Sequence, residues 1–171
     1  WVYEQYRGFA LKTVFRYIYR YENAVEVVND GFVKIFNHFQ QFRLENEQDA
    51  EKLLMGWIKR IMINTAIDEL RKNKMTPEIG GIPDYVWDIT QMNDQPDQQI
   101  IYNDLIGLLK YLPPLYRSIF NLYVIDGYNH IKIAELLNIP VGTSKSGLSR
   151  ARILLQQKIK QLEDVSYAVS G

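Results

Sequence analysis

Residues 76–104 restrict how this chain can fold more than any other segment. They contain no Lys or Arg, but six acidic residues, three prolines and one Gly-Gly pair. Proline and paired glycine disfavour a continuous helix, and like charges repel one another. We therefore expect an acidic linker over 76–104, with one small domain before it (1–75) and another after it (105–171).

The composition excludes several classes of protein. The 171 residues carry 20 basic and 20 acidic side chains, so the net charge is zero. That balance excludes a uniformly basic DNA-coating protein but not a local basic patch, and residues 105–171 carry a net charge of +4. There is no Cys and there are only two His, which argues against disulfides, a metal site or a Cys nucleophile. We expect no cofactor, no small-molecule substrate and no membrane-embedded segment, and we expect a cytoplasmic protein.

The first domain has the apolar periodicity of α-helices. A helix over 24–39 is predicted by one apolar stripe: Val28, Phe32, Ile35, Phe36 and Phe39. An earlier stripe has the same spacing: Tyr6, Ala10, Val14, Tyr17 and Tyr21. A third helix is expected over 57–72. Because alternation of period two is not sustained anywhere, the predicted fold class is all-α, with two small helical domains.

The second domain is also predicted to be helical. Leucines mark a short helix near 105–112, and the next helix follows Pro113-Pro114. Its expected buried face is Leu115, Ile119, Leu122 and Tyr123. Asn129 suits the N-cap of a helix over 130–137, and Asn138 suits the left-handed turn that ends it. A last helix is expected from about 142 to 162.

The final two helices have the spacing of a helix-turn-helix, in which the second helix enters the DNA major groove. The expected inward face of that second helix is Val141, Leu148, Ala151, Leu155, Ile159 and Leu162. The expected outward stripe is Thr143, Ser146, Gly147 and Arg150. Lys145, Arg150 and Arg152 could contact phosphates or bases. The alternative interpretation is a helical hairpin whose basic face is only solvated.

Two polar faces of the first domain are also candidates. Along 57–72, one side carries Trp57, Arg60, Asn64, Asp68 and Arg71. Aromatic, amide and guanidinium groups suit unstacked bases. The alternative is a surface helix with polar i,i+4 pairs and Trp57 in the core. On 24–39, the cluster of Glu26, Asn29 and Asp30 either docks a basic partner or only favours the helix dipole.

Three stretches together resemble the extracytoplasmic-function (ECF) sigma factors, a group within the sigma-70 family of bacterial RNA polymerase subunits. They are AVEVVNDGFVKIF (24–36), WIKRIMINTAIDELRK (57–72) and LPPLYRSIFNLYVIDGYNHIKIAELLNIPVGTSKSGLSRAR (112–152). The resemblance implies core RNA polymerase as a partner, through its β′ clamp helices and β flap, together with promoter DNA and an anti-sigma factor. It implies a promoter-specificity subunit rather than an enzyme.

The resemblance also implies a role for each polar face. The polymerase-docking positions are Glu26, Asn29 and Asp30. The positions facing the minus-ten element are Trp57, Arg60, Asn64, Asp68 and Arg71. The positions facing the minus-thirty-five element are Thr143, Lys145, Ser146, Ser149 and Arg150. The loop from Arg43 to Lys52 is where the family captures a flipped base, and the acidic linker matches the segment that threads toward the polymerase cleft.

Two departures from the family pattern affect the recognition helix. Ser144 stands at an inward position that is usually apolar, so it needs a hydrogen-bond partner if buried. Gly147 stands where Arg often projects into the groove. Two other functions stay open from the residues alone: a stand-alone helix-turn-helix regulator, and a helical enzyme or scaffold, for which we find no nucleophile–base pair, phosphate-binding Gly loop or metal cluster.

Overall fold

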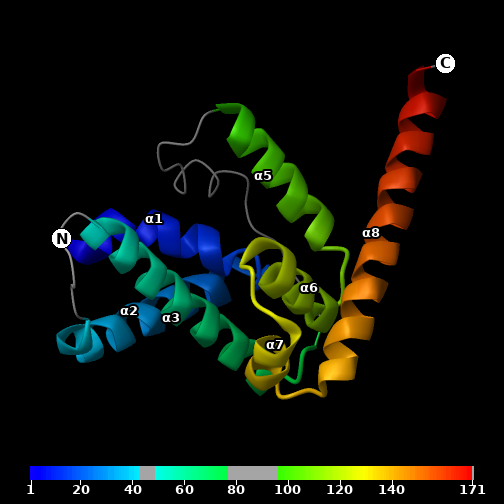
Figure 1. The fold of residues 1–171 in the computed structure, drawn as a ribbon. Coiled ribbons are helices and arrows are strands. Elements are labelled where there is room, and N and C mark those ends of the chain that lie inside the picture. The colour runs from blue at the N-terminus through cyan, green and yellow to red at the C-terminus, as the bar shows by residue number, and fades with distance from the viewer. Residues whose placement is uncertain (43–48, 77–95, 171) are drawn as a thin grey trace. The chain divides into compact units, whose positions relative to one another are not determined.

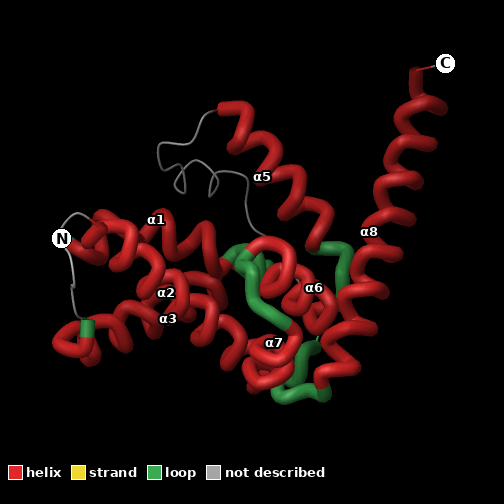
Figure 2. The backbone as a smooth tube through the Cα atoms, viewed as in Figure 1, coloured by secondary structure: helices red, strands yellow, loops and turns green. Residues whose placement is uncertain are grey.

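The structure, a computed structural model, describes residues 1–42, 49–76 and 96–170. These residues form helices and connecting turns, and no strand occurs among them (Figures 1 and 2). They divide into two compact units, one within residues 1–74 and one within 96–170. We call these the N-terminal unit and the C-terminal unit. The predicted all-α class is confirmed.

Among its described residues, the N-terminal unit contains three α-helices, α1 (Val2–Val14), α2 (Tyr21–His38) and α3 (Ala50–Lys72), and a short 3-10 helix, Phe39–Gln41, directly after α2. Each of the three packs on the other two. The largest fully buried side chains of this core are Leu11, Phe15, Tyr17, Ile18, Phe32, Ile35, Ile58, Met62, Ile63 and Ile67. Gly31 lets α2 approach α3 closely, because a Cβ there would lie 2.5 Å from Met62 Sδ.

The helix boundaries in this unit correct the predicted ranges. α2 begins three residues before 24, and α3 begins at Ala50, seven residues before 57. The residues of the predicted stripe that ends at Tyr21 do not all lie on one helix, because α1 ends at Val14. Tyr17 is nevertheless fully buried, so the turn after α1 contributes to the core. Part of the loop from Arg43 to Lys52, residues 43–48, lies outside the described residues.

Four helices and a π-helical turn form the C-terminal unit. They are α5 (Pro96–Leu109), α6 (Pro114–Phe120), the π turn (Asn121–Ile125), α7 (His130–Leu137) and α8 (Val141–Ser170). α5, α6 and α7 all pack on α8. Residues 96–104, which the sequence places in the linker, form the first part of α5.

α8 is longer than expected. The predicted end near Leu162 is eight residues short, since no Pro or Gly interrupts residues 163–170. Its second half is mostly exposed: Ile159 is 42% and Leu162 47% exposed. The predicted inward face therefore holds for Leu148, Ala151 and Leu155 but is wrong for Val141, Ile159 and Leu162. Within the described residues, no helix combines the length and the hydropathy that crossing a bilayer requires.

Candidate functional site

The first candidate face lies on α2. Glu26, Asn29 and Asp30 are all exposed, and the neighbouring Val27 and Val28 are buried. The helix therefore presents the two carboxylates and the amide to solvent while its other side forms the core.

A tyrosine from α1 holds one of these groups in place. The hydroxyl of Tyr3 donates a 3.0 Å hydrogen bond to Asn29 Oδ1, and Arg7 Nε donates to the Tyr3 hydroxyl at 3.3 Å. The Tyr3 ring meets the buried Phe32 ring edge-on, with 4.8 Å between centroids. Tyr3 thus supports this face from α1. No pattern in the sequence identifies it, because the contact joins two helices.

Apolar side chains extend the same side of α2. Val33 is 56% and Phe36 53% exposed, about one and two turns beyond Asn29. Phe39 is also substantially exposed, so the predicted apolar stripe is only partly buried. Large exposed apolar groups beside polar ones are typical of a protein-binding surface. We define the α2 face as Glu26, Asn29, Asp30, Val33 and Phe36.

The second candidate face runs along α3. The five predicted residues lie on one side of one continuous helix, as their spacing requires. Arg60, Asp68 and Arg71 are exposed, whereas Trp57 and Asn64 are half-buried. The interpretation of Trp57 as a core residue is therefore only half right, since part of its ring is accessible.

Asp68 is tied to the neighbouring helix. Lys34 Nζ of α2 lies 3.8 Å from Asp68 Oδ2 and donates a 3.1 Å hydrogen bond to Thr65 Oγ1. Both charged side chains are about half exposed, so the ion pair adds at most about 1 kcal/mol to stability. It offsets the negative charge of Asp68 on a face that otherwise carries two arginines. Asp68 thus contacts another helix of its own unit.

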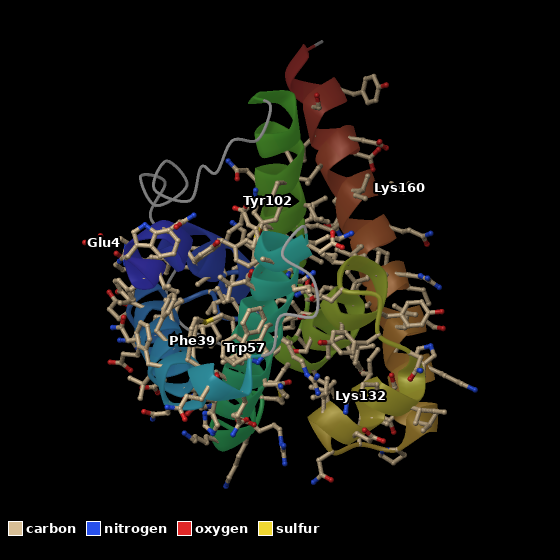
Figure 3. All side chains as sticks on the ribbon, turned by 60° about the vertical axis from the view of Figure 1, so that its left-hand side comes forward. Glu4, Phe39, Trp57, Tyr102, Lys132 and Lys160 are labelled. Atoms are coloured by element: carbon tan, nitrogen blue, oxygen red, sulfur yellow. The ribbon has the colours of Figure 1, made fainter. Side chains whose placement is uncertain are left out.

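An aromatic cluster lies at the start of this face. Phe42 and Trp57 have ring centroids 5.2 Å apart, and Phe39 meets Trp57 edge-on at 6.2 Å. Figure 3 shows Phe39 and Trp57 close together. Phe39 and Phe42 were not among the predicted site residues, because their positions follow from how the end of α2 packs beside α3. The aromatic cluster is Phe39, Phe42 and Trp57.

The third candidate face belongs to the helix-turn-helix made by α7 and the first part of α8. The Asn129 side chain accepts a hydrogen bond from the Lys132 amide at 2.8 Å and caps α7, as predicted. Asn138 ends α7 in the left-handed conformation, with φ 53°. Ile133, Leu137, Leu148 and Ala151 are buried where the two helices pack.

The outer side of α8 presents the predicted polar residues. Lys145, Ser146, Ser149 and Arg150 are exposed, and Thr143 is half-buried. With Arg152 also exposed, residues 141–152 of α8 carry three cations that face solvent. This is the arrangement that a recognition helix presents to a major groove.

Gly147 does not belong to this outer stripe, which corrects the prediction. Gly147 is buried, and a Cβ there would lie 2.5 Å from Ile119 Cδ1 and 3.5 Å from Tyr116 Cδ1 of α6. The glycine permits close packing of α8 on α6. A Cβ at this position faces α6, so Gly147 does not lie on the side of α8 that carries Lys145, Ser146 and Arg150.

We expect Gly147→Ala to lower the free energy of unfolding by about 1 kcal/mol. Overpacking against Ile119, which is fully buried, costs about 1–3 kcal/mol and outweighs a gain of about 1 kcal/mol in helix propensity. The control is Gly107→Ala in α5, where a Cβ meets nothing within 4 Å and we expect a gain of about 0.5–1 kcal/mol. Urea unfolding of the full chain measures both. Equal stabilisation by the two substitutions would contradict the close packing of α8 on α6 at Gly147.

Comparisons with known proteins match both units. Residues 2–76 match the family model for sigma-70 region 2, and residues 102–155 match the model for sigma-70 region 4. The sigma factor SigW of Bacillus subtilis, an ECF RNA polymerase sigma factor, is 25% identical over 167 residues, covering 92% of this chain and 86% of that protein. The chain belongs to the ECF group of the sigma-70 family.

Other members of the family align over similar lengths. The ECF sigma-E factor of Haemophilus influenzae is 26% identical over 161 residues, covering 86% of this chain and 79% of that protein. The sigma factor RpoE, solved with the anti-sigma factor NepR from Bartonella quintana, shares the fold with a TM-score of 0.55. It is 22% identical, and the match covers 90% of this sigma factor and 91% of RpoE.

The three faces fall inside the two matched regions of this sigma factor. The α2 face and the α3 face lie in the region 2 match, and the first turns of α8 lie in the region 4 match, which ends at residue 155. Sigma factors are DNA-binding initiation factors, so these faces are candidates for binding rather than for catalysis. Among the described residues, no group of three His, Asp or Glu side chains could hold a metal ion.

Proposed function

We propose that this ECF sigma factor directs core RNA polymerase to promoters through three separate helix faces. The observation that carries the proposal is the division of α2, α3 and α8 into a buried side and an opposite side that bears the predicted contact residues. The N-terminal unit docks on polymerase and holds the melted minus-ten bases. The C-terminal unit reads the minus-thirty-five duplex and contacts the β flap.

The α2 face binds the β′ clamp helices. Its two carboxylates attract basic partner groups, which speeds association and sets the orientation of the complex. Val33 and Phe36, both more than half exposed, supply the apolar area that such interfaces bury at their centre. Asn29, whose amide oxygen is held by Tyr3, presents a pre-oriented hydrogen-bonding group.

The α3 face holds unpaired bases. Arg60 and Arg71 contact backbone phosphates, and Asn64 reads a base edge. The aromatic cluster supplies ring faces for stacking, worth roughly 1–3 kcal/mol per base. Unstacking and unpairing a base costs a few kcal/mol, so the two terms nearly cancel. Stable melting therefore requires polymerase to hold the bubble as well.

The first three turns of α8 enter the major groove at the minus-thirty-five element. Arg150 offers the bidentate fork that suits guanine, and Lys145 contacts phosphate as a point charge. Thr143, Ser146 and Ser149 add short hydroxyl groups that bond to bases or phosphates. Gly147 takes no part, because it lies against α6.

The remaining assignments follow from the same proposal. We assign residues 1–75 to polymerase binding and minus-ten recognition, the acidic linker to 76–104, with its last part helical in α5, and residues 105–171 to minus-thirty-five recognition. We place the protein in the cytoplasm with the polymerase and the chromosome, and assign it no catalytic activity, cofactor or small-molecule substrate. RpoE was solved with an anti-sigma factor, and we propose an inhibitor of that kind for this chain.

We expect specific promoter binding only in the complex with core polymerase. The chain has zero net charge, and neutralisation of phosphates supplies most non-specific affinity for DNA. The measurement is selection of duplexes from a random-sequence library, with and without core polymerase, followed by transcription from the selected templates. Selection and transcription only with polymerase support the proposal. Tight, sequence-specific binding by the free protein would favour the stand-alone regulator.

A further inference from the structure

A π-helical turn changes the path of the chain after α6. The amide of Asp126 donates to the Asn121 carbonyl at 2.9 Å, a bond that spans five residues instead of four. Tyr123, which the sequence pattern places on the buried face of this segment, lies in the π turn and is 38% exposed. Its ring stacks on the imidazole of His130, with 4.5 Å between centroids and 21° between planes. The π turn thus supports the first residue of α7 from one side.

A nitrogen of the same imidazole also contacts α8, the second helix of the helix-turn-helix. His130 Nδ1 and Ser144 Oγ share a hydrogen bond of 2.8 Å. Ser144 is fully buried on α8, directly before Lys145, and it is the inward polar residue that needed a partner. The bond therefore joins the first turn of α7 to the first turn of α8, across the turn of the helix-turn-helix.

The surroundings of His130 favour its uncharged form, so this hydrogen bond joins two neutral side chains. Burial lowers the pKa of His130, and the charges of Lys145 and Arg152 lower it further. The imidazole is therefore mostly neutral at pH 7, and one of its two ring nitrogens can accept a hydrogen bond from a hydroxyl. A neutral ring also places no additional charge behind the basic outer side of α8.

We infer that His130 is a positioning residue for promoter reading: through Ser144 it sets the rotation of the first turns of α8 and so the directions of Lys145, Ser146 and Arg150. The reason is geometric. Consecutive residues on a helix are about 100° apart, so a fixed inward direction at Ser144 fixes the directions of the residues that follow. Tyr123 holds the imidazole plane, which makes the bond directional. This inference rests on the proposed role of α8 at the minus-thirty-five element.

The test uses the full chain bound to core polymerase and two DNA duplexes. One duplex is selected by the wild type from a random library, and the other is the same duplex with its minus-thirty-five part scrambled. We expect Ser144→Ala and His130→Leu to lower the ratio of the two affinities on the order of tenfold, about what one good hydrogen bond is worth. Affinity for the scrambled duplex should change little, since the phosphate contacts remain.

Two further variants separate positioning from folding. His130→Asn places a hydrogen-bonding group near the position of Nδ1, so it should keep most of the selectivity. Ser118→Ala removes another fully buried hydroxyl of the same unit, one that donates to the Pro114 carbonyl within α6. It should alter stability and leave selectivity unchanged. Thermal unfolding of each variant shows the fraction that is folded at the assay temperature.

Several outcomes would overturn the inference. They are unchanged selectivity in folded Ser144→Ala, an equal loss of affinity for both duplexes, or the same loss of selectivity in Ser118→Ala. If His130→Leu does not fold, His130→Asn and Ser144→Ala decide the question. If the wild type with polymerase selects no minus-thirty-five sequence at all, the proposed function itself fails, and that result is distinct from the others.

Discussion

Glu26→Lys combined with Asp30→Lys is expected to abolish co-elution of this sigma factor with core RNA polymerase. Both side chains are exposed on α2, and neither takes part in the core. Placing like charges together at an interface costs several kcal/mol, which weakens binding on the order of a hundredfold or more. Size-exclusion chromatography of the mixed proteins measures the effect, and circular dichroism checks that the helices remain.

The matched control is Glu4→Lys with Glu51→Lys. These two exposed residues belong to the same unit, and the pair changes the net charge by the same amount. We expect this control to co-elute with polymerase. If both double variants co-elute, the function stands and the docking surface lies elsewhere. If folded wild type never co-elutes, the sigma-factor function proposed for this chain is refuted.

Phe32→Ala is expected to lower the free energy of unfolding by about 3–5 kcal/mol, the cost of removing a buried phenylalanine ring. Phe32 is 2% exposed, and the Tyr3 ring packs edge-on against it. The cavity would lie directly beneath the α2 face, so loss of the ring also releases the tyrosine that orients Asn29. Urea unfolding of the full chain, followed by tryptophan fluorescence and circular dichroism, measures the change.

Phe36→Ala on the same helix is the comparison that separates the core from the interface. The Phe36 ring is 53% exposed, with its centroid 6.2 Å from that of Phe32. We expect its removal to cost less than about 1 kcal/mol of stability, since surface substitutions rarely cost more. We also expect it to weaken polymerase binding several-fold. A large loss of stability in Phe36→Ala would show that the ring belongs to the core and not to the α2 face.

Much of the candidate site followed from local patterns. The exposed residues of α3 and α8 share a face because the helix repeat places them there, and caps such as Asn129 depend on residues only three apart. Tyr3, Phe39 and Phe42 were not predicted as site residues, because their places in the site do not follow from local patterns. Each joins the site through packing between segments far apart in the sequence, which leaves no mark in the spacing of either segment.

Periodicity and composition alone determined the all-α class, the two helical patterns separated by an acidic segment, and the helix-turn-helix with its basic outer side. These properties depend on neighbours within one or two turns, so a single stretch of sequence contains them. Only the tertiary structure decided which apolar residues are buried, since Phe32 and Phe36 have the same chemistry but different neighbours. It also decided that Gly147 faces α6 and that His130 satisfies Ser144. Both depend on the distance between packed helices, which side chains from several elements set together.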